Sequence, residues 1–203
     1  MNTRKRLTGI ALLVACLTLA GFSGKEPVYV NFTIEPLAPG VWAALNTKHG
    51  ICNAGIIDLG DKTVVFDPFM NLDAAEELKA AALYLTHRSP ALVINSHYHN
   101  DHIRGNQVFL PATIISTHWT RQQMAISEPE ELKWEKENAA GILASYRQQA
   151  STVTGWDKEE LPVWINYFEG MVQSGPKIKT TLPDLTFTDS LWISGSRLRL
   201  KLV

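Results

Sequence analysis

The chain has 203 residues, and its 19 Lys and Arg residues against 20 Asp and Glu residues give a net charge of −1. A balance this close to neutral, without a basic stripe, argues against a nucleic-acid-binding surface. The roughly 180 residues that follow an apolar start are enough for one domain with a substantial core.

The amino-terminal segment has the composition of a secretory signal peptide, which we predict at residues 1–23. A basic start at residues 4–6 precedes an apolar run that is shorter than an ordinary membrane span. Small residues near position 23 suit a general signal peptidase. Residues 13–16, Leu-Val-Ala-Cys, resemble a bacterial lipobox instead, which would place a lipid anchor on Cys16. We expect a periplasmic or secreted protein, with a membrane-anchored lipoprotein as the alternative.

The next part of the chain predicts an antiparallel meander. Four strands are expected, over residues 28–34, 41–45, 51–59 and 63–67. Glu35-Pro36 and Pro39-Gly40 supply turn chemistry after the first strand, and Gly60-Asp61 suits a tight hairpin turn after the third. Cys52 lies among isoleucines, so we interpret it as a buried thiol without a metal or catalytic role.

A helix and a buried strand follow the meander. Residues 73–85 have apolar side chains at helical spacing and acids in the first turn, where the helix dipole favours them. Pro90 prevents continuation of this helix. Residues 91–94, Ala-Leu-Val-Ile, are continuously apolar, as in a strand of a sheet that is covered on both faces. Ligand sites favour the carboxyl ends of such strands, so we expect a site just after residue 94.

Residues 95–102, Asn-Ser-His-Tyr-His-Asn-Asp-His, hold three of the six histidines and one carboxylate. Imidazole and carboxylate are ligands of zinc, iron and manganese. His97 and His99 are two residues apart, so both can point the same way at the end of a strand. Asp101 and His102 lie just beyond and can face a neighbouring position. The spacing suits two metal positions better than one, and the alternative is a polar loop that merely solvates a strand end.

One motif resembles the signature of the metallo-β-lactamase superfamily: His97-x-His99-x-Asp101-His102. Asn95-Ser96 before the motif and Gly105-Asn106 after it agree with this family, and residues 53–57 and 63–67 look like the two strands that lead into its fold. The resemblance runs from about residue 28 to residue 203. It implies an α/β fold, the αββα sandwich, of which this chain would supply the N-terminal half with a helical insert.

The resemblance also implies an exported hydrolase of a small-molecule substrate, with two zinc ions that share a water. They would lower the pKa of that water, so that hydroxide attacks a carbonyl, thioester, sulfate ester or phosphoester. His97 and His99 would hold the first zinc, and Asp101 and His102 the second. Asp101 would also orient the nucleophile, as a catalytic residue. Iron and manganese remain compatible with these ligand types.

Asp67 ends the strand predicted over residues 63–67. Local chemistry allows it to cap a turn or helix near Asn71. The resemblance implies another role, in which Asp67 supports the metal-binding loop of residues 95–102 by hydrogen bonding without ligating the metal.

The remaining chain predicts a strand, a helical region and a hairpin. The expected elements are a strand over residues 112–117, helices over 130–150 and 158–172, and strands over 185–187, 191–193 and 197–203. We interpret His118 as a structural residue at the strand-to-helix junction. Several aromatic residues of the helical region are expected to pack the helices. The alternative is that some of them line an apolar substrate pocket, with the helical insert as its wall or lid.

No histidine follows His118, whereas the resemblance implies further metal ligands from a later part of the fold. We therefore expect that the C-terminal half of the fold is missing from this chain, and that the chain alone binds zinc poorly and is inactive. Its last strand would be an open edge through which chains associate. The alternatives are that another chain supplies the missing ligands, or that the protein is a non-catalytic remnant without the full metal site.

Overall fold

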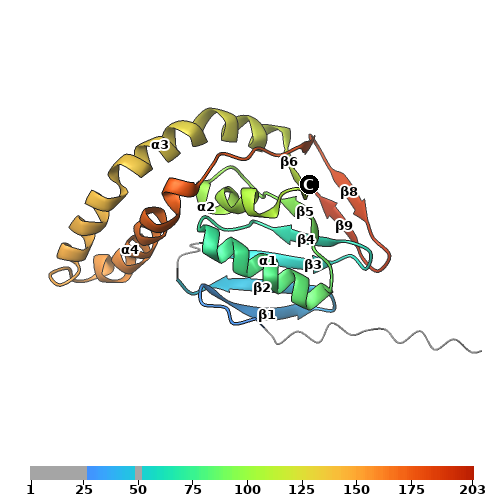
Figure 1. Ribbon diagram of the computed structural model, residues 1–203, viewed down its shortest axis with the longest axis horizontal. Helices are drawn as coiled ribbons and strands as arrows, with labels where there is room; N and C mark the ends of the chain where they lie inside the picture. Colours follow the sequence, from blue (N-terminus) through green and yellow to red (C-terminus); the bar gives the residue numbers. More distant parts are fainter. Residues whose placement is uncertain (1–26, 49–51) are drawn as a thin grey trace, which may run out of the picture.

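A seven-stranded sheet, with its strands in the order β1 to β7, forms the centre of the computed structural model (Figure 1). The structure describes residues 27–48 and 52–203. The expected signal peptide and the alternative lipidation site at Cys16 lie outside the described residues. Among the residues that are described, no helix is both long enough and apolar enough to cross a membrane.

The first four strands form the expected antiparallel meander: β1 (Phe32–Ala38), β2 (Val41–Asn46), β3 (Ala54–Asp58) and β4 (Thr63–Phe66). The hairpin across Gly60-Asp61 is confirmed. The turn expected after the first strand lies at Pro39-Gly40 and not at Glu35-Pro36, because β1 begins later and continues through Glu35 and Pro36, with Pro36 opposite Trp42. Proline is tolerated there because β1 is an edge strand, whose outer side has no hydrogen-bonding partner in the sheet.

The other three strands run parallel to β4: β5 (Pro90–Ile94), β6 (Thr113–Thr117) and β7 (Leu185–Phe187). Successive residues of a strand point to opposite faces of a sheet. Val65 and Ile114 accordingly join one buried cluster, while their neighbours Val64 and Ile115 join another on the opposite face. The apolar runs are therefore buried on both faces of the sheet, as the sequence predicted.

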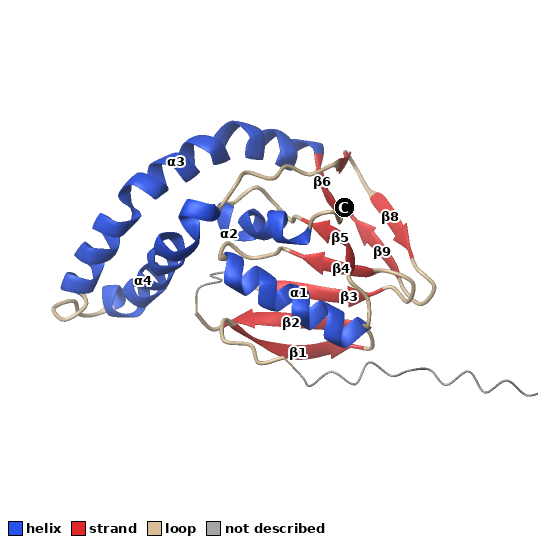
Figure 2. Cartoon of the chain, in the orientation of Figure 1, coloured by secondary structure: helices blue, strands red, loops and turns tan. Residues whose placement is uncertain are grey.

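Helix α1 (Leu72–Thr86) covers one of these faces (Figure 2). Its contact side is mostly alanine, and these small residues let the helix lie close to the strands. Asn71 caps the helix, because its side-chain oxygen accepts hydrogen bonds from the backbone N–H groups of Asp73 (2.9 Å) and Ala74 (3.1 Å). The capping role that local chemistry left open for Asp67 thus belongs to Asn71.

The hairpin of β8 (Leu191–Ser194) and β9 (Arg199–Leu202) packs on the opposite face of the sheet. Ile193 and Leu202 join the buried cluster there. The turn expected between these strands is present and requires glycine, because a Cβ atom on Gly195 would lie 2.2 Å from the carbonyl oxygen of Leu59. A helix, the main sheet and the start of a second sheet therefore stack as in an αββα sandwich.

The helical region consists of α3 (His118–Gln149) and α4 (Trp156–Ser174), which lie side by side and extend beyond the sheet (Figure 1). Both expected helices are present, but α3 begins twelve residues before the predicted start, directly after β6. Thr117 caps it by accepting a hydrogen bond from the N–H of Thr120 (3.0 Å). Pro129 lies inside α3 and does not begin a new helix. His118 is the exposed first residue of α3, at the strand-to-helix junction that was predicted.

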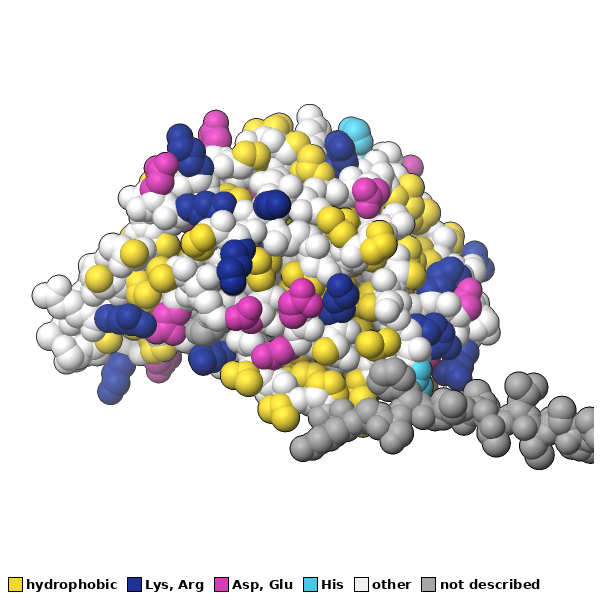
Figure 3. Space-filling model, viewed as in Figure 1, with side chains coloured by type: hydrophobic (Ala, Val, Ile, Leu, Met, Phe, Trp, Pro, Cys, Tyr) yellow, Lys and Arg dark blue, Asp and Glu magenta, His cyan; other side chains and the backbone are white. Residues whose placement is uncertain are grey.

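Charged side chains on the surface view are interspersed with apolar ones, except where basic residues gather near the turns of the β3–β4 and β8–β9 hairpins (Figure 3). At this place Arg88 and Arg197 lie 3.7 Å and 3.1 Å from the carboxylate of Asp58, which is buried. The Arg197 ion pair connects the two hairpins, and both ion pairs compensate the buried charge of Asp58.

Candidate metal centre

Backbone hydrogen bonds bring the ends of three parallel strands to one place. The N–H of Asp67, just after β4, donates to the carbonyl of Ile94 (2.9 Å). The N–H of Asn95, just after β5, donates to the carbonyl of Ile115 (2.9 Å). The loops that follow β4 and β5 are therefore neighbours at the carboxyl edge of the sheet, where the site was expected.

The metal loop, residues 95–102, ends in the short helix α2 (Asn100–Ile103), and the 3₁₀ helix η1 (Arg104–Phe109) follows directly. The N–H of Gly105 donates to the carbonyl of Phe69 (2.8 Å). A Cβ atom at Gly105 would lie 1.8 Å from the carbonyl oxygen of Pro68, so only glycine allows this close approach.

Two buried asparagines join the metal loop to η1 through hydrogen bonds. The amide of Asn95 donates to the side-chain oxygen of Asn106 (3.0 Å), and the amide of Asn106 donates back (2.9 Å). The same Asn95 amide also donates to the carbonyl of His102 (3.3 Å). Residues that only flank the histidine motif in sequence thus determine where the motif lies.

Asp67 is the centre of a hydrogen-bond network beneath the histidines. One of its oxygens accepts from the N–H of Ser96 (2.8 Å), and the other accepts from the Ser96 hydroxyl (2.6 Å) and lies 2.9 Å from Nδ1 of His102. The Ser96 hydroxyl is in turn 2.8 Å from Nδ1 of His97. Asp67 itself is buried and has a left-handed backbone (φ 53°).

These contacts select the ring nitrogen that each histidine presents to solvent. A carboxylate has no hydrogen to donate, so Nδ1 of His102 must carry the proton that Asp67 accepts. The Ser96 hydroxyl gives its only hydrogen to Asp67 and must therefore accept from Nδ1–H of His97. Both rings then have Nε2 as the unprotonated nitrogen, which is the one free to bind a metal ion.

The three histidine rings of the motif lie together. The ring centroid of His97 is 4.5 Å from that of His99 and 4.1 Å from that of His102. Burial and the neighbouring His102 and His99 rings lower the pKa of His97, which favours its neutral form. Burial alone would lower the pKa of His102, but its hydrogen bond to Asp67 and the charges of Asp67 and Asp101 raise it.

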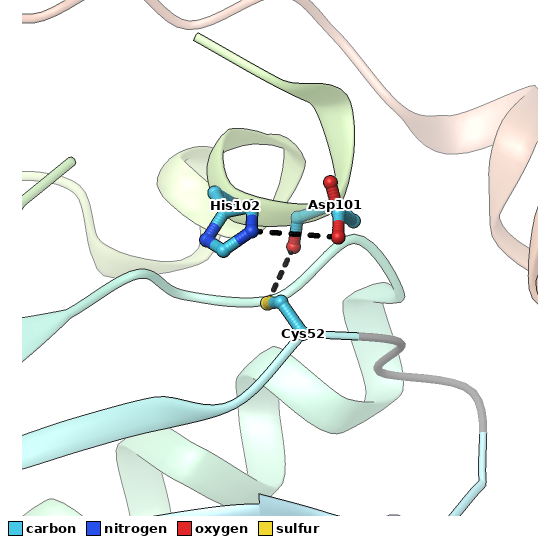
Figure 4. A group of neighbouring side chains, drawn as sticks. All are labelled: Cys52, Asp101 and His102. Carbon is cyan, nitrogen blue, oxygen red and sulfur yellow. Dashed lines mark hydrogen bonds and ion pairs between the residues drawn. The ribbon is translucent and has the colours of Figure 1, made fainter. Parts of the chain in front are cut away.

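Possible ligand atoms form two groups that share His102. In the first, atoms of Asp67, His97 and His102 lie within 4.8 Å of one another. In the second, atoms of Asp101, His102 and Cys52 do so, and Nε2 of His102 is 3.4 Å from the Asp101 carboxylate (Figure 4). Imidazole and carboxylate are zinc ligands, so the histidines and aspartates present fit a zinc ion. Within the described chain, His99 joins neither group.

Cys52 lies beside the motif in space although it is far from it in sequence. Its thiol donates to the backbone carbonyl of Asp101 (2.8 Å) and is buried, as predicted. Burial and the charges of Asp101 and Asp67 raise its pKa, which keeps the thiol protonated. Sequence reasoning missed this neighbour of Asp101, since the segment before β3 carries no local sign of the contact.

A buried charged cluster connects the metal loop to the helical region. Arg104, at the start of η1, donates to Glu128 (2.8 Å) and to Glu135, both on α3, and all three side chains are buried. Burial raises the pKa of Glu128, although the adjacent Arg104 guanidinium opposes this shift. The amide of Asn100, next to Asp101, donates to Glu131 (2.7 Å). The helical region is therefore joined to the metal loop and does not stand apart from it.

A cavity of about 460 Å³ lies at this junction. The metal loop contributes His99, Asn100 and Asp101 to its lining. The rest comes from α3 and α4: Glu131, Trp134, Glu135, Trp164, Tyr167 and Phe168. Both interpretations of the aromatic residues therefore apply, since Tyr167 and Phe168 belong to the buried cluster between the helices and also line the cavity beside the histidines.

Comparison with known proteins identifies the family. The model of the metallo-beta-lactamase superfamily matches residues 47–193. The chain belongs to this superfamily. The match includes the segment before β3, the loop after β4 and the whole histidine motif, so both groups of possible metal ligands lie inside it.

One solved metallo-β-lactamase structure shares the fold over most of this chain. The metallo-beta-lactamase from Pontibacter korlensis is 12% identical, with a TM-score of 0.52, over 85% of this chain and 60% of its own. The enzyme from Hirschia baltica is 23% identical, with a TM-score of 0.42, over 47% of this chain and 48% of its own. The chain therefore spans about half the length of such relatives. A search of curated proteins finds no match.

Proposed function

We propose that the protein is an exported, zinc-dependent hydrolase of the metallo-β-lactamase superfamily, with two zinc ions, that cleaves an ester, thioester, amide or related bond. The observation that carries this proposal is the Asp67–Ser96 network. It leaves Nε2 as the unprotonated nitrogen on both His97 and His102, and Nε2 of His102 lies 3.4 Å from the carboxylate of Asp101. A loop that merely solvated a strand end would not need a buried carboxylate that orients two histidine rings.

In this proposal His97 and His99 hold one zinc ion, and Asp101 and His102 hold the other. Bound zinc supplies Lewis acidity and a water whose pKa is lowered to about 7. Asp101 also orients the attacking water, as the catalytic carboxylate. Asp67 stays outside the ligand set and maintains the protonation of the His102 ring.

A non-catalytic remnant is the second candidate function. It is favoured by the position of His99, which joins neither group of possible ligands in the described chain. Among the described residues, His102 is then grouped with His97 on one side and with Asp101 on the other, and neither group contains three residues of the motif. Such a protein would bind zinc weakly and would not hydrolyse anything.

Metal analysis combined with a turnover assay separates the two candidates. The purified protein, His97→Ala and His118→Ala would be loaded with zinc and assayed with an ester, a thioester and a β-lactam. His118→Ala is the matched control, because His118 is an exposed histidine on α3 outside both groups. For the complete protein we expect zinc-dependent hydrolysis that His97→Ala abolishes and His118→Ala retains, whereas the 203 residues alone should bind zinc poorly and show no turnover. Zinc binding without turnover by the complete protein would favour the remnant, and no zinc binding by it would refute the metal assignment.

Export is proposed from the first 23 residues. Expression of the full gene in a bacterium should give a product that lacks at least residues 1–15 and lies outside the cytoplasm. Palmitate labelling of the wild type but not of Cys16→Ala would assign the lipid anchor. A cytoplasmic protein with an intact amino terminus would contradict export.

A further inference from the structure

The cavity between the metal loop and the helical region has two faces of different chemistry. On one side it opens onto His99 and Asp101. On the other side, Trp134 of α3 and Trp164 of α4 are 54% and 46% exposed. A group bound between the tryptophans would therefore lie directly beside the proposed metal ligands.

Neither tryptophan belongs to the buried cluster between α3 and α4, although Trp164 packs edge-to-face against Tyr167 of the same helix. The buried cluster between these helices is made by other side chains, including Leu132, Leu143, Phe168 and Met171. Exposed indole surface is unfavourable in water, and such surface beside a cavity commonly marks a binding site. The cavity volume of about 460 Å³ is within the usual range for small-molecule sites.

The charge of the cavity is negative. Glu131 is exposed at its edge, and the amide of Asn100 holds its carboxylate in place (2.7 Å). Glu135 is compensated by its contacts with Arg104 and the hydroxyl of Tyr167, so it contributes less. None of the described residues that line the cavity is a lysine or an arginine. Aromatic faces also attract cations, so the carboxylate and the indoles favour the same kind of ligand.

We propose that this cavity binds an apolar substituent of the substrate that carries a positively charged amine, with Trp134 and Trp164 against the apolar part and Glu131 facing the ammonium group. The proposal rests on the proposed hydrolase, since it assigns the substrate class of that same site. It makes Trp134, Trp164 and Glu131 specificity residues, which act on substrate binding and not on the chemical step.

The test uses three probes of the same shape and different charge: 4-phenylbutylamine, 4-phenylbutanol and 4-phenylbutyrate. Binding to the full chain is measured by calorimetry in EDTA, so that no metal ion contributes. We expect the amine to bind about threefold to tenfold more tightly than the alcohol, and the acid to bind most weakly. Equal affinities for the three probes, or tightest binding of the acid, would overturn the proposal.

Variants assign the effect to the cavity. Trp134→Ala and Trp164→Ala should each weaken amine binding about tenfold, while Trp134→Phe should keep most of it. Glu131→Gln should remove the advantage of the amine over the alcohol and leave alcohol binding unchanged. Trp192→Ala is the control, because Trp192 is 50% exposed on β8, outside the cavity. Wild-type binding by both tryptophan-to-alanine variants, with circular dichroism verifying the fold, would refute the assignment.

The result is separable from the test of hydrolysis. Amine-selective binding in EDTA does not need zinc, so it would survive a failure of the proposed catalytic activity. Conversely, zinc-dependent turnover that His97→Ala abolishes, together with no preference among the three probes, would leave the hydrolase intact and refute only the substrate class.

Discussion

Replacement of Asp67 by asparagine tests the hydrogen-bond network beneath the histidines. The carboxylate of Asp67 receives three contacts: the N–H and hydroxyl of Ser96, and Nδ1 of His102. Asparagine has one oxygen where aspartate has two. If that oxygen keeps the N–H of Ser96, an NH₂ group faces Nδ1 of His102.

The expected consequence is a change of tautomer in His102. Its Nδ1 would have to accept a hydrogen bond from the new amide, so the ring proton would move to Nε2, the nitrogen that faces Asp101. Metal binding would then have to break the new hydrogen bond and reverse the tautomer. Loss of such a supporting contact weakens metal affinity about 10- to 100-fold, which corresponds to about 1.4–2.8 kcal/mol.

The backbone should remain in place in this variant. Asp67 has φ 53°, and asparagine is among the residues that tolerate this left-handed conformation best. Asp61→Asn is the matched control, because Asp61 is exposed and forms an ion pair with Lys62 on the β3–β4 turn.

Competition with a chromophoric zinc chelator measures the affinities of the wild type and both variants, and circular dichroism verifies the fold. We expect only Asp67→Asn to bind zinc more weakly. An affinity of Asp67→Asn within threefold of the wild type, or an equal loss in Asp61→Asn, would refute the tautomer argument.

Three further outcomes are expected. In thermal unfolding, Gly105→Ala should lower the free energy of unfolding by about 3 kcal/mol, because the backbone must move to make room for the Cβ atom. Gly141→Ala, which has open space around it on α3, should raise the free energy of unfolding by about 0.5–1 kcal/mol. Similar changes in both variants would contradict the close approach at Gly105. Because the pKa of Glu128 is raised in the folded protein, the free energy of unfolding should fall as pH rises above 4.5, the ordinary pKa of a glutamate. Glu128→Gln should make the free energy of unfolding, measured by urea titration, depend less on pH. An unchanged pH dependence in this variant would contradict the raised pKa of Glu128. We also propose that chains associate through the β9 edge, in which case sedimentation should detect concentration-dependent dimers and not a monomer at every concentration.

The sequence alone determined the elements whose signals are local. The spacing of His97, His99, Asp101 and His102 predicted the candidate site and its place after β5, because ligand spacing and strand-end geometry involve only neighbouring residues. The spacing of apolar residues likewise predicted β4, β5 and α1, because each of these elements buries its apolar side chains on one or both of its faces.

The tertiary structure decided what depends on partners distant in the chain. Pro36 continues β1 because an edge strand needs no hydrogen bond on its outer side, and the sequence does not say which strand is at the edge. Cys52 meets Asp101 across 49 residues, and Arg104 meets Glu128 on another helix. Each of these contacts forms only when the sheet order and the packing of the helices bring the two segments together. The stability of such a contact depends on both segments, so the local sequence of either one does not predict it.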